Sequence, residues 1–244
     1  MKIRTVSLMM AASALAANAQ ALDFDVYNPG AEGIFPVAST LVSGPSEVML
    51  VDAQFSTRDG DELVKMIQAS GKQLTTIYIS AGDPDYYFGL EPLVAAFPEA
   101  RVIASPAVVK HIEATRDAKM AYWGPKLGDG APEKVVVPEA SSQTRFEIDG
   151  ESLEVREINT HQAFLWAPGD KTVLGGVAVN AGSHVWTADT QTKASREQWQ
   201  QGLGKILALD PQRVIPGHFV GEAPEGGNSG DIYPGLSGEF RAGT

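Results

Sequence analysis

The order of the predicted elements constrains the fold of this chain more than any other feature, because strands and helices alternate in two successive halves. The first half contains predicted strands at 34–42, 47–52, 74–80 and 101–105, and predicted helices at 59–69, 90–97 and 106–118. The second half contains two predicted hairpins, at 144–158 and 163–174, then a helix at 195–209 and a short strand at 214–215. This alternation predicts an α/β protein, a sandwich of two sheets with helices on the outside.

The first 21 residues have the pattern of a secretory signal peptide. Lys2 and Arg4 precede an uncharged apolar run at 6–17, and the small-x-small sequences at 17–19 and 19–21 are typical of signal-peptidase sites. A buried N-terminal helix is the alternative. We therefore expect a signal peptide at 1–21, a folded domain at 22–219 and a tail rich in Gly and Pro at 220–244. The expected location is outside the cytoplasm of a bacterium, periplasmic or secreted.

The composition excludes several classes of function. The 244 residues include 30 Asp and Glu but 19 Lys and Arg, and the basic residues are not gathered into a patch. We therefore expect no binding to nucleic acid and no anionic-membrane surface. The chain has no cysteine, which excludes disulfides, thiol catalysis and cysteine-based zinc sites. No segment after residue 21 is long and apolar enough to span a bilayer, so the expected partner is a small-molecule substrate or ligand.

The loop at 80–89 carries two carboxylates, Asp83 and Asp85, directly after a predicted apolar strand. Catalytic and binding groups of α/β folds collect at the carboxyl ends of strands, which favours a site here. Asp residues also cap loops and helices, and a cap for the helix that begins near Leu90 is an equally good interpretation.

Three of the four histidines lie where they can serve a site. His161 and His218 fall in predicted loops, and His218 follows Pro216-Gly217 at the end of a short strand. His184 lies in a stretch, 183–190, that mixes aromatic and polar side chains and can face a pocket. His111 falls in a predicted helix, where a surface or partly buried position is expected.

Together these segments resemble the metallo-β-lactamase fold superfamily over about residues 24–219. The superfamily has His-x-His-x-Asp-His after the corresponding strand, where this chain has Ala-Gly-Asp-Pro-Asp-Tyr at 81–86, followed by Gly89. Its next histidine corresponds to His161, its Gly-Asp corresponds to 176–177, and its closing histidine corresponds to His218 in a Pro-Gly-His context. The resemblance implies an αββα sandwich of two mixed β-sheets flanked by helices.

The resemblance also implies a site, with several ligands replaced. It implies one divalent metal ion, with Zn²⁺ favoured and Mn²⁺ or Fe²⁺ as alternatives, and four candidate ligands: Asp83, Asp85, His161 and His218. Asp85 is the candidate catalytic carboxylate, and Tyr86 and His184 are candidate substrate-binding residues. Ala81 and Val177 stand at ligand positions and offer no donor, and the Tyr86 hydroxyl is a poor ligand near neutral pH.

Two functions remain open from the sequence. The first is a metallo-hydrolase-like protein in which a metal-activated water attacks an ester, lactone or amide, with an activity weakened or lost through the altered ligands. The second is a non-catalytic ligand-binding protein on the same scaffold, without a metal. Ala81 is consistent both with natural divergence and with replacement of a histidine in a more active parent.

Overall fold

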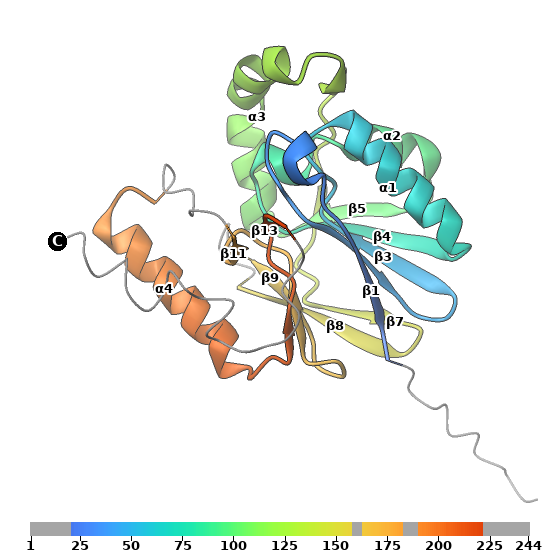
Figure 1. Cartoon of the computed structure of the whole chain (residues 1–244), viewed down its shortest axis with the longest axis vertical. Helices are drawn as coiled ribbons and strands as arrows, with labels where there is room; N and C mark the ends of the chain where they lie inside the picture. The colour runs from blue at the N-terminus through green and yellow to red at the C-terminus, as the bar shows by residue number, and fades with distance from the viewer. Residues whose placement is uncertain (1–20, 158–162, 183–189, 222–244) are drawn as a thin grey trace, which may run out of the picture.

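Two β-sheets stacked face to face form the centre of the molecule, and helices cover both outer faces (Figure 1). The computed structural model describes residues 21–157, 163–182 and 190–221. The predicted signal peptide, apart from residue 21, and residues 222–244 of the predicted tail lie outside these ranges. Within the described ranges, no helix is long and apolar enough to cross a membrane. The arrangement confirms the predicted αββα sandwich of two mixed sheets.

The first sheet has six strands, which follow one another in chain order. They are β1 (Asp23–Tyr27), β2 (Ser39–Ser43), β3 (Glu47–Val51), β4 (Gln73–Ile79), β5 (Arg101–Ala104) and β6 (Glu139–Ala140). The strands from β1 to β3 pair antiparallel, whereas those from β3 to β6 pair parallel. The parallel pairing brings the carboxyl ends of β3, β4 and β5 to the same edge of the sheet.

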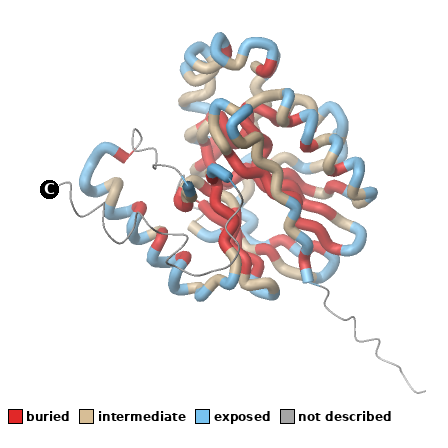
Figure 2. Tube along the Cα trace, viewed as in Figure 1, coloured by how far each residue is buried: buried red, intermediate tan, exposed pale blue. Residues whose placement is uncertain are grey.

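Three helices cover the outer face of this sheet: α1 (Thr57–Ser70), α2 (Leu90–Ala96) and α3 (Pro106–Leu127). Alternate side chains of the strands divide between two apolar layers, as the two-residue period of a strand requires. Val48 and Leu50 of β3 pack beneath the helices, whereas Met49 and Val51 pack against the second sheet. Burial on both faces explains why the central strands are continuous apolar runs (Figure 2).

The second sheet has the order β12-β10-β9-β8-β7 and carries one helix on its outer face. Its elements are β7 (Arg145–Ile148), β8 (Glu151–Arg156), β9 (Phe164–Ala167), β10 (Thr172–Leu174), α4 (Lys193–Ala208) and β12 (Arg213–Val214). Trp199, Leu203 and Ile206 of α4 pack on Phe164 and Trp166 of β9. A short parallel pair, β11 (Asn180–Ala181) with β13 (His218–Phe219), completes the strands, and 3₁₀ turns lie at Gly30–Glu32, Pro84–Tyr86 and Gly128–Gly130.

The helices begin where the sequence supplies capping side chains. Ser56 accepts a hydrogen bond from the backbone of Asp59, and Ser105 accepts one from Val108. Thr192 and Ser195 form a reciprocal capping box at the start of α4. These polar caps fix the helix starts within two residues of the predicted positions.

Two predicted boundaries differ from the structure by more than two residues. The strand expected at 34–42 begins only at Ser39, because Pro36 has no backbone N–H for a ladder and Phe35 packs on Phe55 and Trp123 instead. The helix expected to end near 118 continues to Leu127, and the ring of Trp123 in this extension contacts both Phe35 and Phe55. Aromatic packing between distant segments therefore set both boundaries.

Candidate functional site

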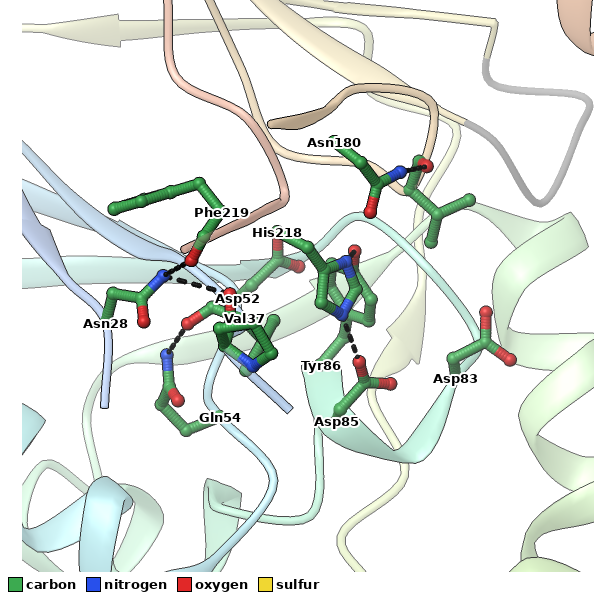
Figure 3. A network of polar contacts seen from close by, with 12 residues as sticks. Asn28, Val37, Asp52, Gln54, Asp83, Asp85, Tyr86, Asn180, His218 and Phe219 are labelled. Carbon is green, nitrogen blue, oxygen red and sulfur yellow. Dashed lines mark hydrogen bonds and ion pairs between the residues drawn. The ribbon is translucent and has the colours of Figure 1, made fainter. Parts of the chain in front are cut away.

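Four chain segments meet at one edge of the sandwich, at the carboxyl ends of β3 and β4 (Figure 3). The backbone N–H of Ala53, after β3, donates to the carbonyl of Tyr86, after β4, at 2.7 Å. The N–H of Gly176, after β10, donates to the Ser80 hydroxyl at 2.8 Å. His218 of β13 forms an isolated bridge with Val37. Functional side chains from distant parts of the sequence thus lie together, as α/β folds favour.

Asp85 and His218 are in direct contact at the centre of this edge. Asp85 lies in the 3₁₀ turn η2 (Pro84–Tyr86), and its Oδ2 atom is 2.7 Å from Nε2 of His218 (Figure 3). Asp85 is 6% exposed as a residue, and the side chain of His218 is 18% exposed. The pair is therefore almost enclosed, yet His218 retains access to solvent.

Tyr86 holds the other nitrogen of the imidazole ring. Its hydroxyl donates to the carbonyl of Gly176 at 3.2 Å and lies 3.2 Å from Nδ1 of His218. The side chain is fully buried, and this burial raises the pKa of Tyr86 well above its usual value. The negative charges of nearby carboxylates act in the same direction and are the smaller cause. The hydroxyl therefore stays protonated and orients His218 from below, rather than facing a ligand.

A close glycine contact makes this arrangement possible. A Cβ atom on Gly217 would lie against the carbonyl of Gly176 and 2.8 Å from the Tyr86 hydroxyl. Only glycine fits at this place, which explains the residue that precedes His218.

Asp83 does not join the pair. Its Oδ1 atom accepts from the ammonium of Lys119 on α3 at 3.1 Å, and Figure 3 shows it apart from Asp85 and His218. The same ammonium donates to the carbonyl of Gly82 at 2.9 Å and lies 3.2 Å from Nε2 of His111. His111 is partly buried, as predicted.

Asp52 lies beneath the site and was not singled out by the sequence. It is fully buried at the end of β3, where its carboxylate accepts from the Ser80 backbone N–H at 2.7 Å and from the Ser80 hydroxyl at 2.9 and 2.7 Å. Burial raises the pKa of Asp52 to about 7, although the hydrogen bonds from Ser80 act in the opposite direction. An Asp at the last position of a predicted strand is the signal that could have identified it.

The structure thus brings together only some of the predicted site residues. Asp85, Tyr86 and His218 are in contact, Asp83 is bound by Lys119, and His161 and His184 lie outside the described residues. In the described ranges, no group of three or more His, Asp or Glu side chains could hold a metal ion. The residues present supply two donors, whereas a catalytic zinc site usually has three protein ligands. Among the described residues, Asp85 and His218 therefore make up an incomplete ligand set, one short of a catalytic zinc site.

Comparison with known proteins agrees with this fold. The family model of the metallo-beta-lactamase superfamily matches residues 33–218, most of the chain. No curated protein sequence is similar enough to count as a match.

Solved structures show the same architecture at low sequence identity. A metallo-beta-lactamase from Pontibacter korlensis is 19% identical and has a TM-score of 0.60, with 88% of this chain and 91% of that chain covered. The B3 metallo-beta-lactamase BLEG-1 is 15% identical with a TM-score of 0.64, covering 88% of this chain and 100% of that chain. A metallo-beta-lactamase family protein from Thermus thermophilus is 19% identical with a TM-score of 0.53, covering 80% and 73%. At these identities the structures show the fold alone, and the family model shows the family. This chain belongs to the metallo-beta-lactamase superfamily.

Proposed function

We propose that this chain is a metallo-hydrolase-like protein with a single altered metal centre, in which Asp85 and His218 hold one divalent cation. Membership of the superfamily supports the general class. The observation that carries the specific proposal is the 2.7 Å contact between Asp85 Oδ2 and His218 Nε2.

The two tautomers of His218 give this contact two different meanings. The Tyr86 hydroxyl lies 3.2 Å from both the Gly176 carbonyl and Nδ1 of His218, so its single proton has two acceptors within reach. When the hydroxyl donates to Nδ1, Nε2 carries the ring proton and donates to Asp85. When the hydroxyl donates to Gly176, Nδ1 carries the ring proton, and the lone pair of Nε2 and the Asp85 carboxylate face the same point. The proposal uses this second tautomer, in which a cation binds to Nε2 and Asp85 together.

The residues around the pair have defined roles in this proposal. Asp85 and His218 bind the ion, Tyr86 fixes the tautomer and direction of His218, and His161 is the candidate third ligand. The contact of Tyr86 with Nδ1 is of a common kind, because a metal-binding histidine usually forms a hydrogen bond through its second ring nitrogen, and this bond strengthens metal binding. A bound Zn²⁺, Mn²⁺ or Fe²⁺ would supply Lewis acidity and a water of lowered pKa for attack on an ester, lactone or amide. His184 is proposed as a contact for the small-molecule substrate, in a chain exported through the signal peptide at 1–21.

A second function is favoured by the same geometry if no ion binds. A ring proton on Nε2 would then be donated to Asp85, with Tyr86 at Nδ1, so that both ring nitrogens of His218 are occupied. Such a histidine cannot act as a general base without losing one of its partners. The chain would then be a ligand-binding protein on the hydrolase scaffold.

Metal retention by the mature chain distinguishes the two. The protein is incubated with Zn²⁺, Mn²⁺ or Fe²⁺, dialysed exhaustively and measured by elemental analysis, beside Asp85→Asn, His218→Ala and His161→Ala. Asp129→Asn is the matched control, because the side chain of Asp129 is fully exposed. We expect about one equivalent in the parent and the control, and loss in the Asp85 and His218 variants. Loss in the His161 variant as well would identify the third ligand.

Two results would contradict the proposal. A parent that retains no metal would leave the ligand-binding function as the better account. Equal retention by the parent and Asp85→Asn would place the ion elsewhere.

A further inference from the structure

Lys119 stands among groups that together resemble the ligand set of a cation. Its ammonium contacts the Gly82 carbonyl at 2.9 Å, the Asp83 carboxylate at 3.1 Å and Nε2 of His111 at 3.2 Å. The lysine side chain is 20% exposed and the Asp83 side chain is 31% exposed, so these contacts are mostly buried but still reach solvent.

The identity of the donor fixes the state of the histidine. An ammonium has three protons to donate and no lone pair, so Nε2 of His111 must accept and carries no proton. Lys119 therefore binds a carbonyl oxygen, a carboxylate oxygen and an imidazole lone pair, the same donor types that bind metal ions in proteins.

The surrounding backbone is packed for this contact. A Cβ atom on Gly82 would lie 2.7 Å from Cδ2 of His111, so the loop approaches α3 as closely as a glycine allows. Lys119 and His111 lie on the same helix, and both reach the loop between Ala81 and Asp85. The helix thus holds Asp83 from one side while Asp85 turns towards His218.

We propose that Lys119 is a built-in replacement for a metal ion at Asp83, and that it limits the chain to the single ion of the proposed function. Asp83 occupies a position where the superfamily has a metal-binding histidine, but its charge is neutralised by the ammonium. As long as Lys119 is present, Asp83 is withheld from metal binding. Lys119 thereby determines how many metal ions the chain binds and how tightly it binds them. This role rests on the proposed function in one respect, the ion held by Asp85 and His218.

Replacing the ammonium by an uncharged side chain of similar length tests the proposal. Zn²⁺ binding to the mature, metal-free chain is measured by calorimetry in the parent, Lys119→Met, Asp83→Asn and the double variant. Lys110→Met is the matched control, because Lys110 lies on the same helix and is exposed. Changes at groups that neighbour metal ligands commonly alter affinity roughly 10–100-fold.

The expected pattern distinguishes release of Asp83 for metal binding from a general change in Zn²⁺ affinity. Lys119→Met should bind Zn²⁺ at least about tenfold more tightly than the parent, or bind a second equivalent. Adding Asp83→Asn to this variant should remove the gain, whereas Asp83→Asn alone and Lys110→Met should bind as the parent does. Asp83→Asn keeps an oxygen acceptor for Lys119, so this arm remains informative even if Lys119→Met does not fold.

Failure of this inference differs from failure of the proposed function. Unchanged Zn²⁺ binding in folded Lys119→Met, or a gain that persists in the double variant, would overturn the role of Lys119. Weaker binding in Asp83→Asn alone would also overturn it, because Asp83 would then be a ligand in the parent. If the parent binds no Zn²⁺ while Lys119→Met gains an ion that depends on Asp83, the inference stands and the proposed function fails.

Discussion

Replacing Asp52 by Asn should make the stability of this protein less dependent on pH. Asp52 is fully buried at the end of β3, and its carboxylate contacts the backbone N–H and the hydroxyl of Ser80. Asn has the same shape and can accept from the Ser80 N–H while donating to the hydroxyl oxygen. The substitution therefore removes the ionisable group and keeps the packing.

The magnitude follows from the raised pKa. Burial raises the pKa of Asp52 from 3.8 to about 7, so between these values the folded chain holds a proton that the unfolded chain releases. The stabilisation that Asp52 contributes is therefore complete below its pKa in the unfolded chain. It is lost as the pH rises through the pKa of Asp52 in the folded chain. A tenfold difference in proton affinity between the folded and unfolded chains corresponds to about 1.4 kcal/mol, which gives a fall of about 2–3 kcal/mol between pH 5 and pH 8.

Urea unfolding of the metal-free chain at several pH values between 5 and 8 measures this effect. The parent and Asp52→Asn share all other titrating groups, so the difference between their pH profiles isolates Asp52. We expect the free energy of unfolding of Asp52→Asn to fall less across this range, by about 2–3 kcal/mol. Asp129→Asn removes one carboxylate at a fully exposed position and is the control.

Parallel profiles for the parent and Asp52→Asn would contradict a raised pKa of Asp52 in the folded chain. They would mean that Asp52 is already ionised at pH 5 in the folded chain, with the hydrogen bonds from Ser80 outweighing burial. A steeper fall in the variant would refute it equally, because it would reverse the sign of the linkage.

Three further substitutions test the packing around the site and the core. Tyr86→Phe leaves the Gly176 carbonyl without its partner, which should cost about 1–3 kcal/mol in urea unfolding and weaken Zn²⁺ binding roughly 10–100-fold in calorimetry. Gly217→Ala should lower the free energy of unfolding by about 1–3 kcal/mol, because its Cβ would collide with the Gly176 carbonyl and crowd Tyr86. Ile206→Ala should cost about 2–5 kcal/mol by leaving a cavity between α4 and the second sheet, without changing Zn²⁺ affinity. Zn²⁺ affinity unchanged in Tyr86→Phe, or an unfolding midpoint unchanged in either of the others, would contradict these contacts.

Local sequence patterns were sufficient to predict most of the fold. The apolar runs of the central strands, the Asp149-Gly150 turn and the serine caps are local signals, and each element they predicted is present. The strand boundary at Ser39 and the extension of α3 to Leu127 were not predictable in this way. Both depend on contacts of Phe35 with Trp123, which is 88 residues further along the chain.

The candidate site was predictable only in part, because residue type does not give direction. Asp85 and His218 were expected to share a site and are in contact. Nothing in the sequence indicated that Tyr86 would be buried beneath His218, since an aromatic side chain in a loop can face either way. The ion pair between Asp83 and Lys119 was equally unpredictable from the sequence, because the lysine lies 36 residues away on a helix with no unusual pattern.

Anomalous diffraction at the zinc edge, from crystals of residues 22–244 grown with Zn²⁺, decides whether Asp85 and His218 hold the ion. We expect one peak within about 2.0–2.2 Å of both Asp85 Oδ2 and His218 Nε2, with Asp83 still bound by Lys119. A peak on Asp83, or no peak beside His218 at saturating Zn²⁺, would contradict it.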